Sequence, residues 1–206
     1  WTVRCLDMGA RLVQLRLKNT PPDALDESIA CCAAAAHRHG AHLFINDHWQ
    51  AALRHARQAP GIYGVHLGQD DVQALDDAAL NRLQASGLRL GISSQTLWQL
   101  ARALHLRPSY VACGPVHATA TKDVALPPVG ENSLRFWAHI VHGSAAPQHP
   151  PLPLVAIGGM NAERACRAAA AGADSVAVVS AITQAPDPTQ AIAALQQAIA
   201  AGLEQR

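Results

Sequence analysis

The stretch LVAIGGMNAERACRAAAAGADSVAVVSAI, residues 154–182, places two short aliphatic runs on either side of an alanine-rich segment. The runs Leu154–Ile157 and Ser175–Val178 have the length and composition of buried strands, and residues 161–171 between them predict a helix. A strand, a helix and a second strand in this order form one unit of a parallel sheet. This stretch therefore favours an α/β fold.

The same alternation extends over the rest of the chain, where each aliphatic run is bounded by Gly, Asn or Asp. The other predicted strands are Leu12–Leu17, His42–Ile45, Ile62–His66, Leu88–Ile92 and Tyr110–Cys113. The other predicted helices cover residues 2–9, 23–39, 48–58, 74–86, 95–105, 131–142 and 187–203.

This order of elements begins with a helix and predicts a (β/α)₈ TIM barrel that lacks its first strand. We expect residues 1–206 to form a single barrel domain that is incomplete at its N-terminus. The rival fold is a doubly wound open sheet, which would be expected to show a Gly-x-Gly-x-x-Gly turn after its first strand. The sequence has no such turn.

Composition excludes several classes of function. The 16 Lys and Arg residues nearly balance the 15 Asp and Glu residues, so a net charge of +1 provides no general field for binding nucleic acid. No apolar run approaches the roughly 20 residues that a membrane-spanning helix needs. The five cysteines include no Cys-x-x-Cys pair, and an odd number of them favours reduced thiols and a cytoplasmic location.

The segment VQLRLK, residues 13–18, carries the first candidate site. Side chains alternate along a strand, so Gln14, Arg16 and Lys18 share one face, and the apolar residues between them share the other. If the apolar face packs against helices, the polar face points into the barrel. Charges there are costly unless an anion binds them, although an internal network of ion pairs is the alternative.

Carboxylates follow the next two predicted strands, at Asp47 and at the pair Asp70 and Asp71. Oxygen ligands near cationic side chains suit Mg²⁺, which keeps several waters and bridges to substrate phosphates. One carboxylate of the pair could instead cap the following helix. His66 is read as a hydrogen-bonded barrel residue in preference to a catalytic base.

Three later loops add polar and glycine residues. The loop GPVHATATK, residues 114–122, carries two hydroxyls and one ammonium, as ligand-binding loops often do. Gly158 and Gly159 precede a helix start, an arrangement that binds anions, and Ser180 follows the next strand. TIM barrels frequently bind phosphate at these two loops. Two anion sites imply two phosphorylated substrates.

These residues resemble the thiamine-phosphate synthase family, also called thiamine-phosphate pyrophosphorylase. The resemblance rests on seven segments in the family's order: QLRLK (14–18), IND (45–47), GVHLGQDD (64–71), LGIS (90–93), GPVHATATK (114–122), VAIGGMN (155–161) and VAVVSAI (176–182). It implies a Mg²⁺-dependent transferase that joins hydroxymethylpyrimidine diphosphate to hydroxyethylthiazole phosphate, giving thiamine phosphate and pyrophosphate. In family members the carbon–oxygen bond breaks first, and the thiazole nitrogen captures the resulting pyrimidinyl-methyl cation.

The resemblance also assigns residues to roles. Those implied to hold the pyrimidine diphosphate are Gln14, Leu15, Arg16, Leu17, Lys18, Asn46, Ser93 and Lys122, of which Arg16, Lys18, Ser93 and Lys122 are the expected catalytic set. Those implied to hold the thiazole phosphate are Thr119, Ala120, Thr121, Gly159, Val179 and Ser180. Asp47 and Asp71 are implied to bind Mg²⁺.

Some features depart from the family pattern. His117 and Ala118 stand where many members carry an aromatic residue and proline, and His48 occupies a variable position to which we assign no role. Some relatives are fused behind a hydroxymethylpyrimidine kinase, which would account for a chain that begins within a domain. Two other functions stay open: a thiazole tautomerase-like barrel, and a barrel that binds thiamine phosphate without catalysis.

Overall fold

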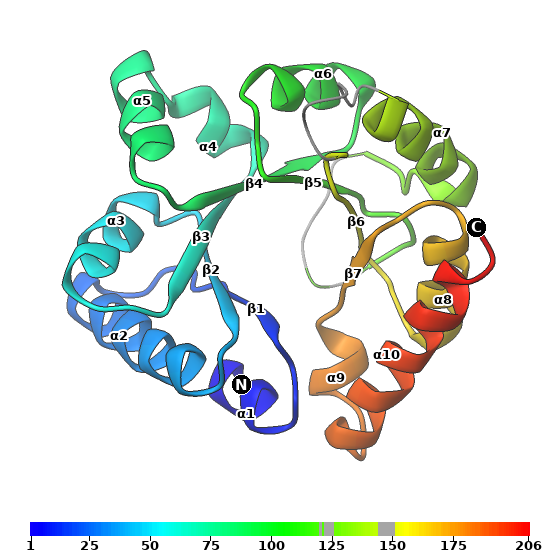
Figure 1. Cartoon of the computed structure of the whole chain (residues 1–206), viewed down its shortest axis with the longest axis horizontal. Helices are drawn as coiled ribbons and strands as arrows, with labels where there is room; N and C mark the ends of the chain where they lie inside the picture. The colour runs from blue at the N-terminus through cyan, green and yellow to red at the C-terminus, as the bar shows by residue number, and fades with distance from the viewer. Residues whose placement is uncertain (120, 122–125, 144–150) are drawn as a thin grey trace. The chain divides into compact units, whose positions relative to one another are not determined.

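The computed structural model describes residues 1–119, 121, 126–143 and 151–206. The chain forms two compact units, Trp1–Ile92 and Ser93–Arg206. In each unit, parallel strands alternate with helices along the chain (Figure 1).

The first unit has its strands in sequence order. Its elements are α1 (Thr2–Asp7), β1 (Leu12–Leu15), α2 (Pro22–Arg38), β2 (His42–Asn46), α3 (Trp49–Gln58), β3 (Ile62–Leu67), α4 (Gln69–Ala74), α5 (Asp77–Ala85) and β4 (Arg89–Ser94), which extends two residues past the unit. The register aligns Leu15 with Ile45, Ile45 with Val65 and Val65 with Leu90. Because the strands are parallel, the residues that follow them gather at one edge of the sheet.

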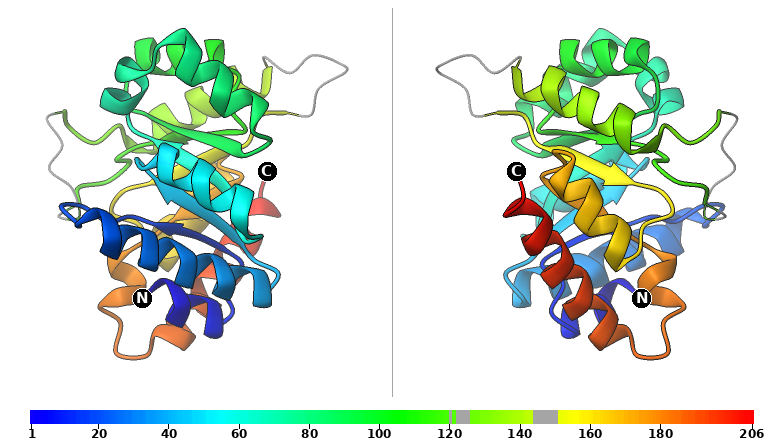
Figure 2. Two further views of the ribbon diagram at one scale, coloured as in Figure 1. Left: turned by 90° about the vertical axis from the view of Figure 1, so that its left-hand side faces the viewer. Right: turned by 90° about the vertical axis from the view of Figure 1, so that its right-hand side faces the viewer.

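Helices α2 and α3 cover one face of this sheet, in front of the strands in the left view of Figure 2. Their small buried residues, such as Ala36 and Ala52, let the helices approach the strands closely. At Gly61 an added Cβ would lie 2.1 Å from the carbonyl oxygen of Ala33 on α2, so only glycine fits this approach.

The second unit continues the alternation. Its elements are α6 (Leu97–His105), β5 (Tyr110–Cys113), α7 (Gly130–Gly143), β6 (Leu154–Ile157), α8 (Ala162–Ala170), β7 (Ser175–Ala177), α9 (Ser180–Thr183) and α10 (Pro188–Leu203). Strand β6 pairs in parallel with β5 and with β7. Helices α8 and α10 lie side by side (Figure 2, right), and Gly202 permits this, since a Cβ there would lie 2.2 Å from the carbonyl oxygen of Cys166.

All seven predicted strands are present, with β1 ending at Leu15, two residues earlier than predicted. The helix predicted over residues 74–86 is present as α5 but begins three residues later, at Asp77, and the short helix α4 before it was not predicted. Asp76 sets the later start, because it caps α5 by accepting a hydrogen bond of 2.7 Å from the amide of Ala79. The short helix α9 was not predicted. Among the described residues, no helix is both long and apolar enough to span a membrane.

Candidate functional site

The polar side chains of the first segment leave β1 at its carboxyl end. Leu15 is buried, whereas Gln14, Arg16 and Lys18 are exposed. This difference follows the alternation predicted from the sequence, with the apolar side chain packed and the polar ones accessible to a ligand. Pairing with β2 ends at Leu15, so Arg16 and Lys18 belong to a loop.

Asp47 lies in the turn between β2 and α3. Its φ is +64°, in the left-handed region, and its amide donates a 2.9 Å hydrogen bond to the carbonyl oxygen of His66 on β3. The Lys18 ammonium donates a hydrogen bond to Oδ2 of Asp47. Burial alone raises the pKa of the Asp47 carboxyl, but the hydrogen bond from Lys18, followed by the effects of Asp71 and Arg16, lowers the pKa below its usual value.

Asp71 lies beside Asp47, and the pKa of its carboxyl is shifted in the opposite direction. Burial and the negative charge of Asp47 raise the pKa of the Asp71 carboxyl, although a hydrogen bond from the Gly68 amide opposes them. That amide donates to Oδ2 of Asp71 at 3.0 Å, at the start of α4. From the sequence, either Asp70 or Asp71 could cap the following helix, and in the structure Asp71 makes the capping contact.

This carboxylate pair fits a magnesium ion. Two carboxylates close enough to share a hydrogen bond repel one another when both are ionised, and a divalent cation relieves that repulsion. In the described part of the chain, no group of three or more His, Cys, Asp or Glu side chains could hold a metal. A two-carboxylate site suits Mg²⁺ because this ion takes few protein ligands and completes its shell with water and phosphate oxygens.

Three more residues border this cluster. Asn46, the last residue of β2, is buried and lies in register with the buried His66 of β3. His48 has its Nε2 at 3.0 Å from the carbonyl oxygen of Leu17. No role was predicted for His48 from the sequence, and the only signal available was its position directly after Asp47.

In the second unit, the loop after β6 is held against the loop after β5. The Val116 amide donates to the carbonyl oxygen of Ile157 at 2.8 Å, and the His117 amide donates to that of Gly158 at 3.1 Å. Gly159 has a φ of +62°, and a Cβ there would lie 2.4 Å from the carbonyl oxygen of Ala118. A Cβ at Gly158 would lie 2.4 Å from the Cβ of Pro115. The packing of these two loops therefore requires glycine at both positions.

The start of α8 follows these glycines. Asn161 caps the helix by accepting a 2.9 Å hydrogen bond from the Arg164 amide, and the Arg164 guanidinium donates to the carbonyl oxygen of Gly159 at 2.6 Å. Burial, reinforced by the positive charge of Arg164, lowers the pKa of His117, while Glu131 at 3.4 Å opposes that shift. Arg164 adds a cation beside the predicted phosphate loop, and it was not predicted from the sequence.

The remaining predicted residues lie at the expected strand ends. Ser93 lies on β4, while Val179 and Ser180 are exposed at the start of α9, after β7. Thr119 accepts a 3.2 Å hydrogen bond through Oγ1 from the Thr121 amide. The predicted residues Ala120 and Lys122 lie outside the described part of the chain.

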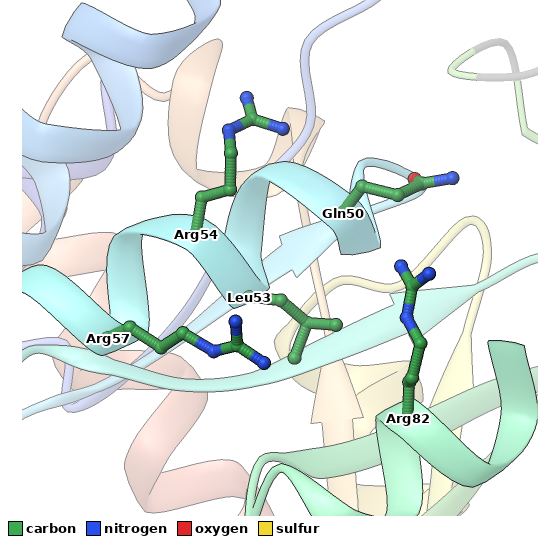
Figure 3. A pocket seen from close by; sticks show the side chains of 5 residues that line it. All are labelled: Gln50, Leu53, Arg54, Arg57 and Arg82. Carbon is green, nitrogen blue, oxygen red and sulfur yellow. The ribbon is translucent and has the colours of Figure 1, made fainter.

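A separate pocket of about 260 Å³ lies between α3 and α5 (Figure 3). It is lined by Gln50, Leu53, Arg54, Arg57 and Arg82. Two of the arginines have partners: Arg54 donates to Asp26 at 3.0 Å, and Arg82 stacks over the ring of Trp49 at 5.0 Å. None of the predicted site residues lines this pocket.

Comparison with known proteins places these residues in a family. The family model described as thiamine monophosphate synthase matches residues 1–182. The chain belongs to this family. A thiamine-phosphate synthase of Serratia proteamaculans is 44% identical over 97% of this chain and 86% of its own length. A thiamine-phosphate synthase of Escherichia coli O157:H7 is 42% identical over 99% of this chain and 89% of its own length.

A solved structure confirms the fold class predicted from the sequence, an α/β barrel of the TIM type. The thiamine phosphate pyrophosphorylase from Pyrococcus furiosus superposes with a TM-score of 0.78 at 27% identity, covering 98% of this chain and 89% of that one. An orotidine 5'-phosphate decarboxylase from Pyrococcus horikoshii, with a TM-score of 0.63 and 15% identity, shares the fold alone.

Proposed function

We propose that this chain joins hydroxymethylpyrimidine diphosphate to hydroxyethylthiazole phosphate, giving thiamine phosphate and pyrophosphate. Thiamine-phosphate synthase activity, which makes the chain a transferase, is supported by the family match and by curated relatives that are 42–44% identical over nearly its whole length. The structural observation that carries the proposal is the cluster of Lys18, Asp47 and Asp71 at the carboxyl edge of the first unit's sheet.

The pyrimidine diphosphate is assigned to the first unit's cluster. Arg16 and Lys18 are exposed cations that can each meet a diphosphate oxygen, and Lys18 carries donors that rotate to suit it. Asn46 can donate a neutral hydrogen bond from the adjacent strand end. Gln14, Leu15, Leu17, Ser93 and Lys122 complete the proposed set, by their resemblance to the family.

Asp47 and Asp71 would hold Mg²⁺, with phosphate oxygens and water as its remaining ligands. When bound, the ion would neutralise negative charge on the departing pyrophosphate. Asp47 is already held near its ionised form by Lys18. In the free protein, burial and the neighbouring Asp47 raise the pKa of the Asp71 carboxyl, and a bound cation would offset both effects.

The thiazole phosphate is assigned to the second unit's loops. The backbone at Gly159 and the start of α8 present amides, and Arg164 lies beside them as a counter-charge. Ser180 adds a hydroxyl at the exposed start of α9. Thr119, Ala120, Thr121 and Val179 complete this set, again by their resemblance to the family.

The proposed reaction requires stabilisation of a leaving group and little general acid–base catalysis. As the carbon–oxygen bond of the pyrimidine substrate breaks, negative charge grows on pyrophosphate, and Arg16 and Lys18 are placed to neutralise it. The thiazole nitrogen captures the resulting cation. No residue of the proposed set has to remove a proton from carbon.

Incubation with both substrates, and with each alone, tests the proposal. We expect thiamine phosphate and pyrophosphate in equal amounts when both substrates are present, and neither product when one is omitted. Thiamine phosphate that binds without any turnover would support a binding protein instead. Proton exchange on the thiazole without pyrophosphate release would support a tautomerase.

A further inference from the structure

His48 connects the loop after β1 to the beginning of α3. Its Nε2 lies 3.0 Å from the carbonyl oxygen of Leu17, and because a carbonyl only accepts, this ring nitrogen carries the proton and donates. The carbonyl of His48 accepts a 3.0 Å hydrogen bond from the amide of Ala52, which is the first hydrogen bond of α3. The backbone that carries the His48 side chain is therefore anchored at the start of α3.

The loop residue that His48 holds lies between two proposed diphosphate ligands. Leu17 follows Arg16, and its carbonyl belongs to the peptide that leads into Lys18. Fixing that oxygen restricts rotation of the peptide and so sets the direction in which the Lys18 side chain leaves the backbone. The next residue, Asn19, has a φ of +55°, so the chain turns sharply after Lys18.

Two side-chain contacts link this loop to the turn after β2. One is the ion pair of Lys18 with Asp47, and the other is the hydrogen bond of His48 with Leu17. Regular pairing with β2 ends before the loop, at Leu15. These contacts therefore hold the loop where the sheet no longer does.

The two contacts respond differently to substrate. In the proposed function, Lys18 turns to a phosphate oxygen and Asp47 to Mg²⁺, so their ion pair is exchanged when substrate binds. The contact of His48 with Leu17 involves neither a proposed metal ligand nor a charged loop side chain. It can persist throughout the exchange and hold the backbone between the two cations.

We propose that His48 is a positioning residue that keeps Arg16 and Lys18 aligned for the diphosphate while the Lys18–Asp47 ion pair is exchanged. This inference rests on the proposed function. It predicts that His48 acts on the pyrimidine substrate alone, because the loop it holds carries no proposed ligand of the thiazole phosphate.

Two substitutions of His48 distinguish the effect of losing the hydrogen bond from the effect of losing the imidazole ring. In H48Q the amide nitrogen can reach the place of Nε2 and donate, whereas the shorter side chain of H48N cannot. We expect H48N to raise KM for hydroxymethylpyrimidine diphosphate by about tenfold, the effect of losing one hydrogen bond of ordinary strength. We expect KM for the thiazole phosphate to change less than about twofold and H48Q to restore most of the loss.

The matched control is H37N, the same substitution at an exposed histidine of α2, which should leave both KM values at their wild-type levels. A merely structural role predicts a different pattern. If H48N raised both KM values equally, or if H48Q were as defective as H48N, the inference would be overturned.

Amide hydrogen exchange of the peptide covering residues 16–20 gives a readout that does not need turnover. With magnesium and inorganic pyrophosphate added, we expect faster exchange in H48N than in the wild type, and wild-type exchange in H48Q. Equal exchange in all three proteins would overturn the inference. A wild-type protein that makes no thiamine phosphate would overturn the proposed function, while the exchange data would still decide whether His48 holds the loop.

Discussion

The Lys18 ammonium donates to Oδ2 of Asp47, and this ion pair joins the loop after β1 to the turn after β2. The Lys18 side chain is 54% exposed, whereas that of Asp47 is 15% exposed. An ion pair in which one side chain is this exposed contributes little to the free energy of unfolding. Its position between two strand ends instead suits a cation and an anion that exchange partners when substrate binds.

Replacing Lys18 by Gln should therefore impair catalysis much more than folding. We expect turnover to fall on the order of 10²- to 10³-fold, by analogy with a lost donor to a developing oxyanion. The free energy of unfolding should change by less than about 1 kcal/mol. Pyrophosphate release and urea unfolding measure the two effects, with R38Q on α2 as the control for the lost charge. Near-normal turnover in K18Q would remove Lys18 from the mechanism.

Replacing Asp71 by Asn should weaken magnesium binding without harming the fold. Asn keeps an oxygen that can accept from the Gly68 amide, and it removes the charge that Asp47 repels. We expect the Mg²⁺ concentration for half-maximal activity to rise roughly tenfold, since carboxylate charge sets much of such affinities. Stability without Mg²⁺ should be equal to or greater than that of the wild type.

The control for that experiment is D70N, which neutralises the exposed neighbouring carboxylate. It should leave the magnesium dependence unchanged. Equal shifts in D70N and D71N would mean that the general negative charge of the segment, and not a ligand at Asp71, sets the magnesium dependence.

Replacing Gly159 by Ala should act on the thiazole substrate. The residue has a φ of +62°, and its new Cβ would lie 2.4 Å from the carbonyl oxygen of Ala118, so the loop must shift. We expect KM for the thiazole phosphate to rise by about tenfold or more, corresponding to a strain of about 1–2 kcal/mol. KM for the pyrimidine diphosphate should stay constant. G143A, where an added Cβ meets nothing within 4 Å, is the control.

Asp174 should make the stability of the second unit depend on pH. Burial tends to raise the pKa of its carboxyl, but the Leu154 amide, His142 and Arg206 donate to it and lower the pKa overall. A lowered pKa stabilises the fold above the usual value near 4, and this stabilisation is lost as pH falls through the folded value.

The substitution D174N should lower the free energy of unfolding at pH 7 by about 1.5–3 kcal/mol, the contribution of a hydrogen bond to a charged group. Urea unfolding at pH 7, 5 and 3 should show this difference shrink in the most acid sample. A difference that stays constant down to pH 3 would contradict the role of the charge. E204Q, at an exposed carboxylate after α10, should show no such difference.

Lys122 is predicted from the sequence to meet the departing pyrophosphate. We expect K122A to keep the fold, as judged by its circular dichroism and thermal midpoint, and to lose most turnover. Turnover close to that of the wild type would exclude Lys122 from the chemistry.

Much of the fold could be predicted from local patterns. Short aliphatic runs such as Tyr110–Cys113 and Leu154–Ile157 are strands with the predicted bounds, because their β-branched and aliphatic residues fill a buried parallel sheet. The boundary at Asp76 was missed although an Asp before a helical run is a common cap. The early end of β1 could not be predicted, since it depends on where the paired strand stops.

The site was predictable in its residue types and less so in its contacts. Alternation along VQLRLK showed which side chains share a face, but not that Lys18 meets Asp47 in the free protein. Likewise, the need for glycine at position 159 comes from Ala118, which is 41 residues earlier in the sequence. Contacts of this kind are made by tertiary packing, and no local pattern encodes them.

The proposed function is best tested by incubating the purified chain with the two phosphorylated substrates, with Mg²⁺ and with the metal removed by a chelator, and measuring thiamine phosphate. We predict one pyrophosphate released for each thiamine phosphate formed when Mg²⁺ is present, and a loss of both products when it is removed. Product formation at the same rate without Mg²⁺ would rule out the proposed metal site, and the absence of product with both substrates and Mg²⁺ supplied would rule out the proposed function.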